Sequence, residues 1–354
     1  MSRYFSGKYA ALTPYTPGEQ PRDMRYIKLN TNESPYPPSP LAREYARKAA
    51  QTLQLYSDPT CKALTDAASA LYGLCSDEML FTNGSDEILN FAFMAFCDSD
   101  HEAWFPDVTY GFYPVFAELS GIPYRQIPLK EDFTVDPGDY QGCTGAIFIA
   151  NPNAPTGLAL TRRQIEEILT ANPDSVVVVD EAYVDFGGES CVGLIRRYPN
   201  LLVTQTFSKS RNLAGGRLGM GFGCRELIQD LNTIKYSTNP YNVNSMTMAA
   251  GVGALEDRAY FEACCREIVT TRAATAEALE ALGFTMPQSL ANFLFIRHPR
   301  LGGLALYQEL KRRGILVRHF ETPRLKDYNR VTIGSPEQME TLIAALKSIL
   351  EELS

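Results

Sequence analysis

Between residues 103 and 204, short runs of β-forming residues alternate with helical segments. The runs lie at 103–105, 124–128, 146–149, 176–179 and 201–204, with helices expected from 110 and from 162. Such alternation is typical of βαβ units, which build a mostly parallel sheet with helices on both faces. Sheets of this kind bind ligands at the carboxyl ends of their strands. A site is therefore expected just after 179 and 204.

The rest of the chain is arranged around this predicted sheet. Residues 1–40 are rich in proline, which prevents a long helix and predicts an extended arm that packs on the C-terminal part or on a partner subunit. Strand and helix patterns restart after 282 and predict a compact α+β unit. With 354 residues the chain exceeds one compact core. We expect an arm (1–40), a large domain (41–282) and a small domain (283–354).

Composition narrows the class of protein. The net charge is −8 and no basic run is present, which disfavours a nucleic-acid partner. No segment approaches the ~20 apolar residues of a membrane span, so we expect a cytoplasmic protein that binds no membrane. The eight cysteines show no C-x-x-C pairing and the chain has only three histidines, which indicates reduced thiols and no metal site.

A lysine beside hydroxyl groups follows the run at 201–204. The segment Thr206-Phe207-Ser208-Lys209 is followed eight residues after the lysine by Arg217. A lysine amine can form a Schiff base with an aldehyde, while hydroxyls and a guanidinium suit a phosphate. The spacing predicts a reactive amine next to a phosphate cradle.

A second polar pair follows the neighbouring run of four valines. Asp180 ends that run and Tyr183 lies three residues further on. A carboxylate after a strand is ordinarily a turn or cap residue, but carboxylate and phenol together can hold opposite parts of one pyridine ring. With Lys209 at the aldehyde, these groups match the needs of pyridoxal phosphate chemistry.

Two upstream segments supply further parts of such a site. The turn Asn83-Gly84-Ser85-Asp86 leads into a helix whose free N–H groups suit an anion. Asp86 is explained equally well as a residue that satisfies the helix dipole. Tyr110 opens another helix and is expected either to stack on the pyridine face or to join the core.

Together with the turn Asn151-Pro152-Asn153-Ala154-Pro155-Thr156-Gly157, these motifs resemble the fold-type I pyridoxal phosphate aminotransferases over nearly the whole chain. The segments 29–38, 56–59 and 241–245 are similar to those of the histidinol-phosphate aminotransferase family. The resemblance implies an α/β fold in which a large domain holds a mostly parallel seven-stranded sheet between helices, with a smaller α+β domain. It also implies pyridoxal 5′-phosphate as cofactor and a homodimer with shared active sites.

The resemblance assigns a role to each candidate residue. Lys209 is catalytic. The cofactor-binding residues are Tyr56, which reaches the neighbouring subunit's cofactor phosphate, and Gly84, Ser85, Asp86, Tyr110, Asn153, Asp180, Tyr183, Thr206, Ser208 and Arg217. The substrate-binding residues are Tyr15, Asn32, Arg318 and Arg330. The family's turn has an asparagine at the position of Ala154, where it contacts the ring's phenolate oxygen, and Asn153 is expected to replace it.

The implied activity is transfer of an amino group between glutamate and a phosphorylated ketone, imidazole acetol phosphate, in histidine biosynthesis. An aromatic amino acid aminotransferase and a threonine-phosphate decarboxylase on the same scaffold remain open, because all three substrates are anionic. From another class, the run from Gly219 to Gly223 suggests a nicotinamide-dependent oxidoreductase. However, Cys224 stands where the dinucleotide motif requires its third glycine, and the run does not follow a first strand.

Overall fold

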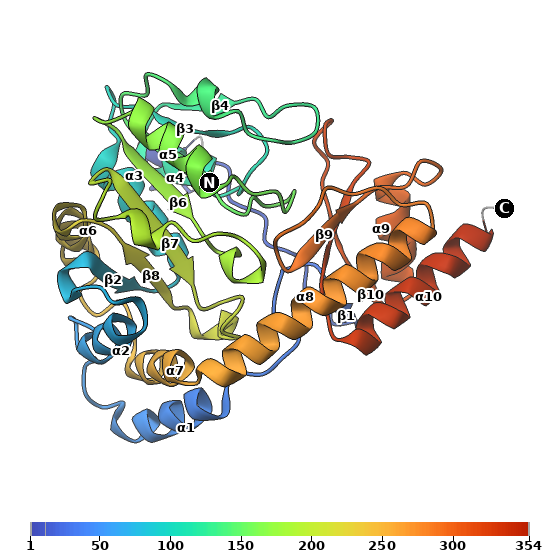
Figure 1. Cartoon of the computed structure of the whole chain (residues 1–354), viewed down its shortest axis with the longest axis horizontal. Coiled ribbons are helices and arrows are strands. Elements are labelled where there is room, and N and C mark those ends of the chain that lie inside the picture. The colour runs from blue at the N-terminus through green and yellow to red at the C-terminus, as the bar shows by residue number, and fades with distance from the viewer. Residues whose placement is uncertain (1, 11, 353–354) are drawn as a thin grey trace.

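A seven-stranded sheet forms the centre of the larger part of the molecule, in the order β2-β8-β7-β6-β5-β3-β4 (Figure 1). The structure, a computed structural model, describes residues 2–10 and 12–352. Five neighbouring strands are parallel: β3 (Ala103–Pro106), β4 (Tyr124–Ile127), β5 (Ala146–Ala150), β6 (Val176–Asp180) and β7 (Leu201–Thr206). Only β8 (Gly219–Phe222) runs antiparallel, to β7 and to β2 (Met79–Thr82). The predicted mostly parallel sheet is confirmed.

The strand β8 corresponds to the glycine run that suggested a nicotinamide site. A Cβ on Gly219 would lie 2.4 Å from the backbone nitrogen of Ser85, and one on Gly221 would lie 2.7 Å from Leu80 Cδ2. The glycines are therefore required because another segment packs closely on this strand, and not because a dinucleotide binds there. The dinucleotide interpretation is wrong.

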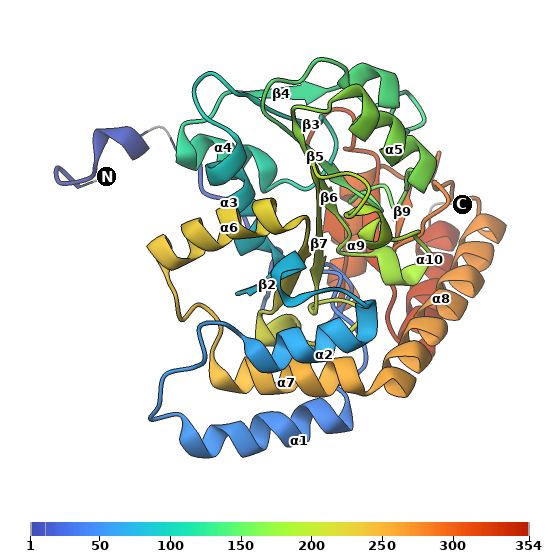
Figure 2. The same cartoon turned by 60° about the vertical axis from the view of Figure 1, so that its left-hand side comes forward.

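Helices cover both faces of the large sheet, as Figure 2 shows. One core contains Val177 and Val179 of β6 and is covered by α1 (Pro40–Ala49), α2 (Lys62–Tyr72), α5 (Arg162–Ala171) and α7 (Ser245–Glu256). The other contains Val178 and is covered by α3 (Ser85–Phe96), α4 (Tyr113–Ser120) and α6 (Arg225–Thr238). Successive valines point to opposite faces because strand side chains alternate, so an unbroken apolar run fits a strand buried on both sides.

A second, smaller sheet has the order β11-β12-β9 and is antiparallel throughout. Its strands are β9 (Phe293–Ile296), β11 (Arg318–His319) and β12 (Asn329–Thr332). The helices α8 (Arg258–Ala281), α9 (Gly303–Arg312) and α10 (Pro336–Glu352) belong to the same part of the molecule. A separate core cluster here includes Ile268 of α8, Val331 and Leu342, so α8 contributes to the small core.

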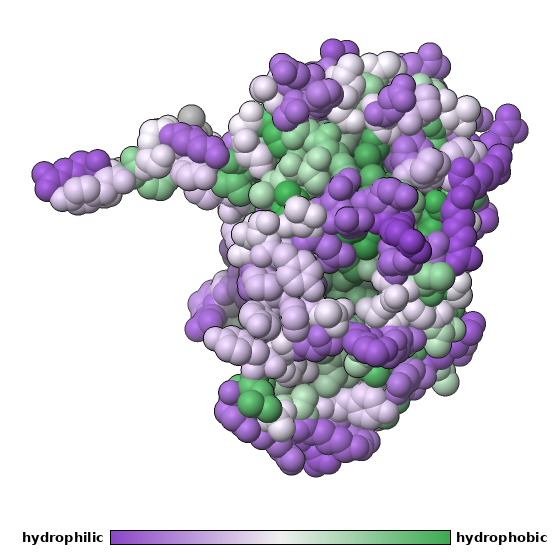
Figure 3. Space-filling model, turned by 90° about the vertical axis from the view of Figure 1, so that its left-hand side faces the viewer, coloured by the Kyte–Doolittle hydropathy of each residue, from purple (hydrophilic) through white to green (hydrophobic). Residues whose placement is uncertain are grey.

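The N-terminal segment contacts this smaller part of the molecule. β1 (Ile27–Lys28) pairs in parallel with β10 (Ile315–Leu316), and Leu29 is buried in the small core. The segment 2–10 protrudes from the body, as the N-terminal label in Figure 2 and the projection in Figure 3 show, and Tyr4 is 79% exposed. Glu19 also forms an ion pair with Lys311 and accepts a hydrogen bond from Tyr307, so the arm already contacts the C-terminal part at residue 19. The exact domain limits at 40 and 282 stay a proposal. None of the described helices has the length and hydrophobicity needed to cross a lipid bilayer.

Candidate active site

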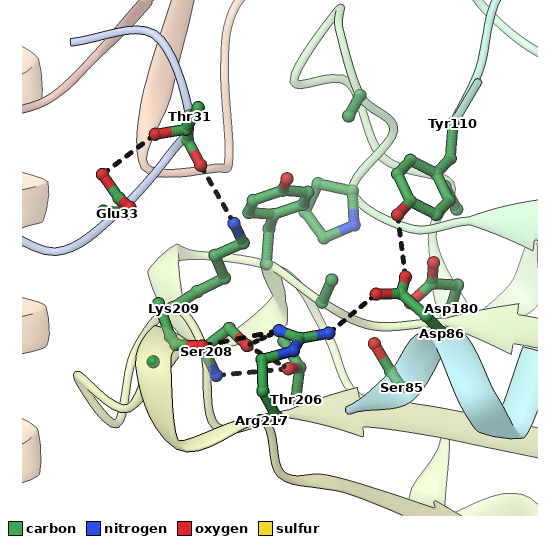
Figure 4. A pocket seen from close by; sticks show the side chains of 17 residues that line it. Thr31, Glu33, Ser85, Asp86, Tyr110, Asp180, Thr206, Ser208, Lys209 and Arg217 are labelled. Atoms are coloured by element: carbon green, nitrogen blue, oxygen red, sulfur yellow. Dashed lines mark hydrogen bonds and ion pairs between the residues drawn. The ribbon is translucent and has the colours of Figure 1, made fainter. Parts of the chain in front are cut away.

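A cavity of about 330 Å³ lies at the carboxyl ends of β6 and β7, where the sequence predicted a site. Figure 4 shows side chains from several elements that converge on it. It is lined by these predicted site residues: Ser85, Asp86, Tyr110, Asp180, Tyr183, Thr206, Ser208, Lys209 and Arg217. The sheet therefore brings most of the candidate residues to one place.

Lys209 follows β7 and points into this cavity. Its Nζ donates a hydrogen bond to the backbone oxygen of Thr31 at 3.2 Å, and among the described residues it forms no ion pair with a carboxylate. Burial, and secondarily the nearby Arg330 guanidinium, lower the pKa of Lys209 to about 8. A substantial fraction of the amine is therefore neutral near physiological pH, as a nucleophile must be.

Asp180 ends β6 and presents a buried carboxylate to the same cavity. Thr204 Oγ1 donates to it at 3.2 Å and the Tyr113 hydroxyl donates at 3.3 Å. Burial raises the pKa of Asp180 to about 6, the negative Asp86 adds to the rise, and the two hydroxyl donors oppose it. At neutral pH the group is a carboxylate that would be stabilised by a cationic partner.

The start of α3 and the loop after β7 form a cradle at one end of the cavity. Arg217 donates to Asp86 Oδ2 at 2.9 Å and to Ser208 Oγ at 3.3 Å, and the hydroxyls of Thr206 and Ser208 lie 3.0 Å apart. Gly84 is the N-cap residue of α3, and among the described residues no side chain caps the helix there. Its φ is +81°, and a Cβ there would lie 2.5 Å from Arg217 Nη2, so glycine is required. Free helix N–H groups, hydroxyls and a guanidinium form a suitable donor set for a phosphate.

Two tyrosines line other walls. The Tyr110 hydroxyl donates to Asp86 Oδ1 at 2.7 Å, and burial followed by Asp86 raises the pKa of this phenol. Tyr183 Oη accepts a hydrogen bond from Asn32 Nδ2 at 2.9 Å. Burial raises the pKa of Tyr183, while Arg330 and the Asn32 amide oppose the rise. Both phenols are thus protonated donors at neutral pH.

The structure does not bring Asn153 to the cavity. Its amide nitrogen donates to the Val108 oxygen at 3.0 Å and to Thr156 Oγ1 at 3.1 Å, while its carbonyl accepts from Thr109 at 2.8 Å. The side chain is therefore fully hydrogen-bonded to neighbouring protein groups, and its role in place of an amide at position 154 stays a prediction. The wall contains Ala154 itself.

Other candidates are also absent from the residues that line this cavity: Tyr15, Asn32, Tyr56, Gly84, Arg318 and Arg330. Tyr56 is 84% exposed and stacks on Tyr241 with ring centroids 4.7 Å apart. The Tyr15 ring contacts Phe112, with centroids 4.5 Å apart, at the edge of the Tyr110 loop. Their predicted roles with cofactor and substrate stay predictions.

Arg318 and Arg330 form a pair of like charges on the small sheet. They are direct cross-strand partners of β11 and β12, and each Cζ lies 6.0 Å from the centre of the Phe320 ring. Arg330 donates to the Asn30 oxygen at 3.1 Å, whereas its buried Nε has no hydrogen-bond partner in the part of the chain that the structure describes. Neither guanidinium has a carboxylate within ion-pair distance among the described residues. Like charges placed directly opposite are unfavourable, so the pair is suited to bind an anion.

Several supporting residues were not found from the sequence. Tyr113 and Thr204 hold Asp180, and Thr31 and Glu33 form part of the cavity wall. Thr204 could have been predicted from the sequence, because it lies on the same strand face as Thr206, two residues later. The contribution of Thr31 depends on a contact between segments 178 residues apart, which no local pattern encodes.

The comparison with known proteins agrees with this geometry. Residues 25–346 match the family model for aminotransferase class I and II. A histidinol-phosphate aminotransferase of Chromohalobacter salexigens is 48% identical over 350 residues, which cover 99% of each chain. A histidinol-phosphate aminotransferase of Brachyspira hyodysenteriae is 46% identical over 357 residues, covering 99% of this chain and 100% of the relative.

A solved structure shares the fold. It is the histidinol-phosphate aminotransferase of Sinorhizobium meliloti in complex with pyridoxal-5′-phosphate, with a TM-score of 0.86 and 21% identity. The match covers 93% of this chain and 92% of that chain.

Proposed function

Because the chain belongs to the class I and II aminotransferases and to their histidinol-phosphate aminotransferase family, we propose that it transfers an amino group from L-histidinol phosphate to 2-oxoglutarate. The products are imidazole acetol phosphate and L-glutamate, and the reaction belongs to histidine biosynthesis. Pyridoxal 5′-phosphate is the cofactor of such enzymes. When bound, it supplies a protonated ring that withdraws electrons from the substrate's α-carbon.

The residues of the cavity fit this cofactor. At one end, the uncapped start of α3, Ser208 and Arg217 offer donors to a phosphate. At the other, the buried Asp180 carboxylate has a pKa raised to about 6, and a cationic ring nitrogen would offset that burial cost. Lys209 lines the same cavity and has no competing carboxylate partner among the described residues.

Each residue then has a defined task. Lys209 Nζ would hold the cofactor and, as a free amine, would accept the proton from the substrate's α-carbon. Asp180 would keep the cofactor's ring nitrogen protonated, and Thr204 and Tyr113 orient its carboxylate. Tyr183 would offer its O–H to the cofactor's ring oxygen, and Tyr110 would lie against the ring.

The pair of arginines on the small sheet supports a phosphorylated substrate, and the full-length relatives carry the choice of histidinol phosphate among such substrates. Arg318 and Arg330 place two guanidiniums side by side without a carboxylate, and such a pair suits the doubly charged phosphate of histidinol phosphate. The side-chain carboxylate of glutamate can use the same pair in the other half of the cycle. One anion site then serves both substrates.

We also propose that the enzyme is a cytoplasmic homodimer with shared active sites. The exposed Tyr56, stacked on Tyr241 outside its own cavity, supports donation to the cofactor phosphate of the neighbouring subunit. The biosynthetic class of the relatives supports the location.

A substrate panel tests the function. The purified holoenzyme is assayed with histidinol phosphate, phenylalanine and threonine phosphate at equal concentrations, with 2-oxoglutarate as acceptor. We expect kcat/KM for histidinol phosphate to exceed that for phenylalanine by at least about tenfold, because phenylalanine lacks the doubly charged group. Faster turnover of phenylalanine, or release of carbon dioxide from threonine phosphate, would refute the proposal.

A further inference from the structure

Every polar group of Asn32 is used in a hydrogen bond, and the partners lie on two different parts of the molecule. Its backbone N–H donates to Thr332 Oγ1 at 2.9 Å, and its backbone oxygen accepts from Asn292 Nδ2 at 3.1 Å. Its amide oxygen accepts from the Thr332 hydroxyl at 3.0 Å. The remaining group, Nδ2, donates to Tyr183 Oη at 2.9 Å. Small-sheet residues therefore fix Asn32, and Asn32 fixes Tyr183.

The orientation of this amide follows from the chemistry of its neighbours. The Thr332 hydroxyl already accepts the backbone N–H of Asn32, so its own proton is available for the amide oxygen. That places the nitrogen, which can only donate, against Tyr183. Asn32 is 1% exposed and adopts the left-handed region with φ of +56°. This buried, uncommon conformation is held in place by its hydrogen bonds and leaves the amide little freedom.

The bond to Asn32 also fixes the direction of the Tyr183 proton. Because Tyr183 Oη accepts from an N–H, its own O–H must donate elsewhere. In the described part of the chain no second hydrogen bond to this oxygen is present. The ring lies edge-on to Phe293, with centroids 5.1 Å apart, and its neighbours in that cluster are apolar. The free proton is therefore available to a ligand in the cavity that Tyr183 lines.

No other amide stands near this phenol in the turn that follows β5. Ala154 packs with Tyr183 and Phe293, and Asn153 is turned toward Val108. The methyl group of Ala154 contributes packing but no hydrogen bond. The turn thus leaves the phenolic oxygen dependent on a residue from the N-terminal segment.

We propose that Asn32 is a positioning residue that acts through Tyr183, directing the phenol's proton at the ring oxygen of bound cofactor in place of an amide that position 154 does not provide. The inference rests on the proposed pyridoxal phosphate site. It differs from the sequence-based prediction that Asn32 contacts the substrate. Because Thr332 and Asn292 hold Asn32, the position of the small sheet determines where the Asn32 amide lies relative to the Tyr183 hydroxyl.

The variant Asn32→Asp reverses this hydrogen bond while keeping size and shape. A carboxylate oxygen accepts only, so the Tyr183 proton turns toward residue 32 and away from the cavity. Two quantities are measured on the enzyme without substrate: the Kd of pyridoxal 5′-phosphate, and the pH midpoint of the cofactor's absorbance change. We expect about threefold to tenfold weaker cofactor binding, as for one lost hydrogen bond, and a shifted midpoint.

Asn172→Asp is the matched control. Asn172 is a buried asparagine whose oxygen accepts from Gly142 and Cys143, outside the cavity. It undergoes the same chemical change, so loss of fold stability alone would appear in both variants. Only the Asn32 variant is expected to shift the absorbance midpoint.

Two double variants test whether the effect passes through the phenol. Adding Ala154→Asn to Asn32→Asp supplies an amide from the other side and should restore the midpoint toward that of the wild type. In a Tyr183→Phe background, Asn32→Asp should cause no further shift, because its target is already gone. If Asn32→Asp fails to fold, Thr332→Val tests the same link by releasing the amide oxygen, with a smaller shift in the same direction.

A different pattern would overturn the inference. If Asn32→Asp matches Asn172→Asp in midpoint and cofactor Kd and changes only the KM for histidinol phosphate, Asn32 is a substrate contact. An additive effect in the Tyr183→Phe background would also contradict it. Since these measurements contain no substrate, a negative substrate panel would refute the proposed reaction without changing them.

Discussion

The two ends of the active site carry arginines in opposite electrostatic settings. At the large-sheet end, Arg217 is paired with Asp86 at 2.9 Å and bonded to Ser208. On the small sheet, Arg318 and Arg330 are cross-strand partners, and the buried Nε of Arg330 has no hydrogen-bond partner among the described residues. The charge of Arg217 is balanced by Asp86. The charges of Arg318 and Arg330 have no carboxylate partner in the described part of the chain, which is why we propose that the substrate's anion binds there.

This difference agrees with how long each proposed ligand stays bound. A cofactor that stays bound needs a preformed cradle, and Asp86 keeps Arg217 in place when that cradle is empty. A substrate that enters and leaves in each cycle gains most from a site that is unfavourable when empty. Burial lowers the pKa of Arg330 and the adjacent Arg318 adds to this, so bound anion relieves a real electrostatic cost.

Lys209→Ala should have the largest effect, because the Lys209 amine is the proposed nucleophile and proton carrier. We expect turnover to fall by at least about 10³-fold through loss of proton transfer, while cofactor still binds without a covalent link. Borohydride treatment followed by mass measurement checks the link. Lys62→Ala, an exposed lysine paired with Asp66, is the control. Retained transamination in Lys209→Ala would contradict the mechanism.

Replacing Arg330 or Arg217 by glutamine, one at a time, should distinguish substrate binding from cofactor binding. Arg330→Gln should raise the KM for histidinol phosphate by about tenfold to a hundredfold and leave cofactor affinity unchanged, since a charged hydrogen-bond donor is lost only at the substrate end. Arg217→Gln should instead weaken cofactor binding by a similar factor. Equilibrium titration with cofactor and steady-state kinetics measure both. If both variants lose cofactor alike, the two ends are not independent.

The same contrast predicts opposite effects on the stability of the apoprotein. Arg330→Gln removes one of two facing positive charges and should leave the melting temperature unchanged or higher. Arg217→Gln leaves Asp86 without its partner near Asp180 and should lower the melting temperature modestly. The corresponding loss of unfolding free energy is about 1 kcal/mol or less, because the pair is half-exposed. Thermal denaturation without cofactor measures both changes. A drop for Arg330→Gln would mean that the pair is structural.

Lys209 should also make apoprotein stability depend on pH. Its pKa is lowered from 10.5 to about 8 in the folded chain, so the unfolded chain binds more protons between these values. Stability therefore rises with pH through that window, and the cost of the buried ammonium is fully present below about 8. The difference in unfolding free energy between wild type and Lys209→Ala should shrink by up to about 3 kcal/mol across the window. A constant difference would show that the amine is not desolvated.

Tyr56→Phe should have the smallest effect, because it removes one hydroxyl from the phosphate cradle, which has several other donors. We expect about threefold weaker cofactor binding, because Ser208, Arg217 and the α3 start remain. The loss should vanish on dilution to monomers, where the partner's hydroxyl is absent in both proteins. Full cofactor affinity of diluted wild-type enzyme would exclude donation across subunits.

Local patterns predicted the parts of this protein whose causes are local. Lys209 and Asp180 were found because each follows an apolar strand, and the valines of β6 specify a strand buried on both faces. The strand β8 was not predicted. One of its glycines, Gly219, is needed because Ser85 of another element packs closely against it, and no local pattern shows this contact. Asn153 was assigned to the site because sequence does not tell which way a turn side chain points. The link from Asn32 to Tyr183 joins residues 151 apart and has no local signature.

The N-terminal segment that lines the cavity is held by residues near the other end of the chain. Asn32 bonds to Thr332, 300 residues away, and β1 lies beside β10. Thr31, which receives the hydrogen bond of Lys209, directly precedes Asn32 and lines the cavity. The part of the cavity wall next to Lys209 is thus held in place by the C-terminal part of the chain.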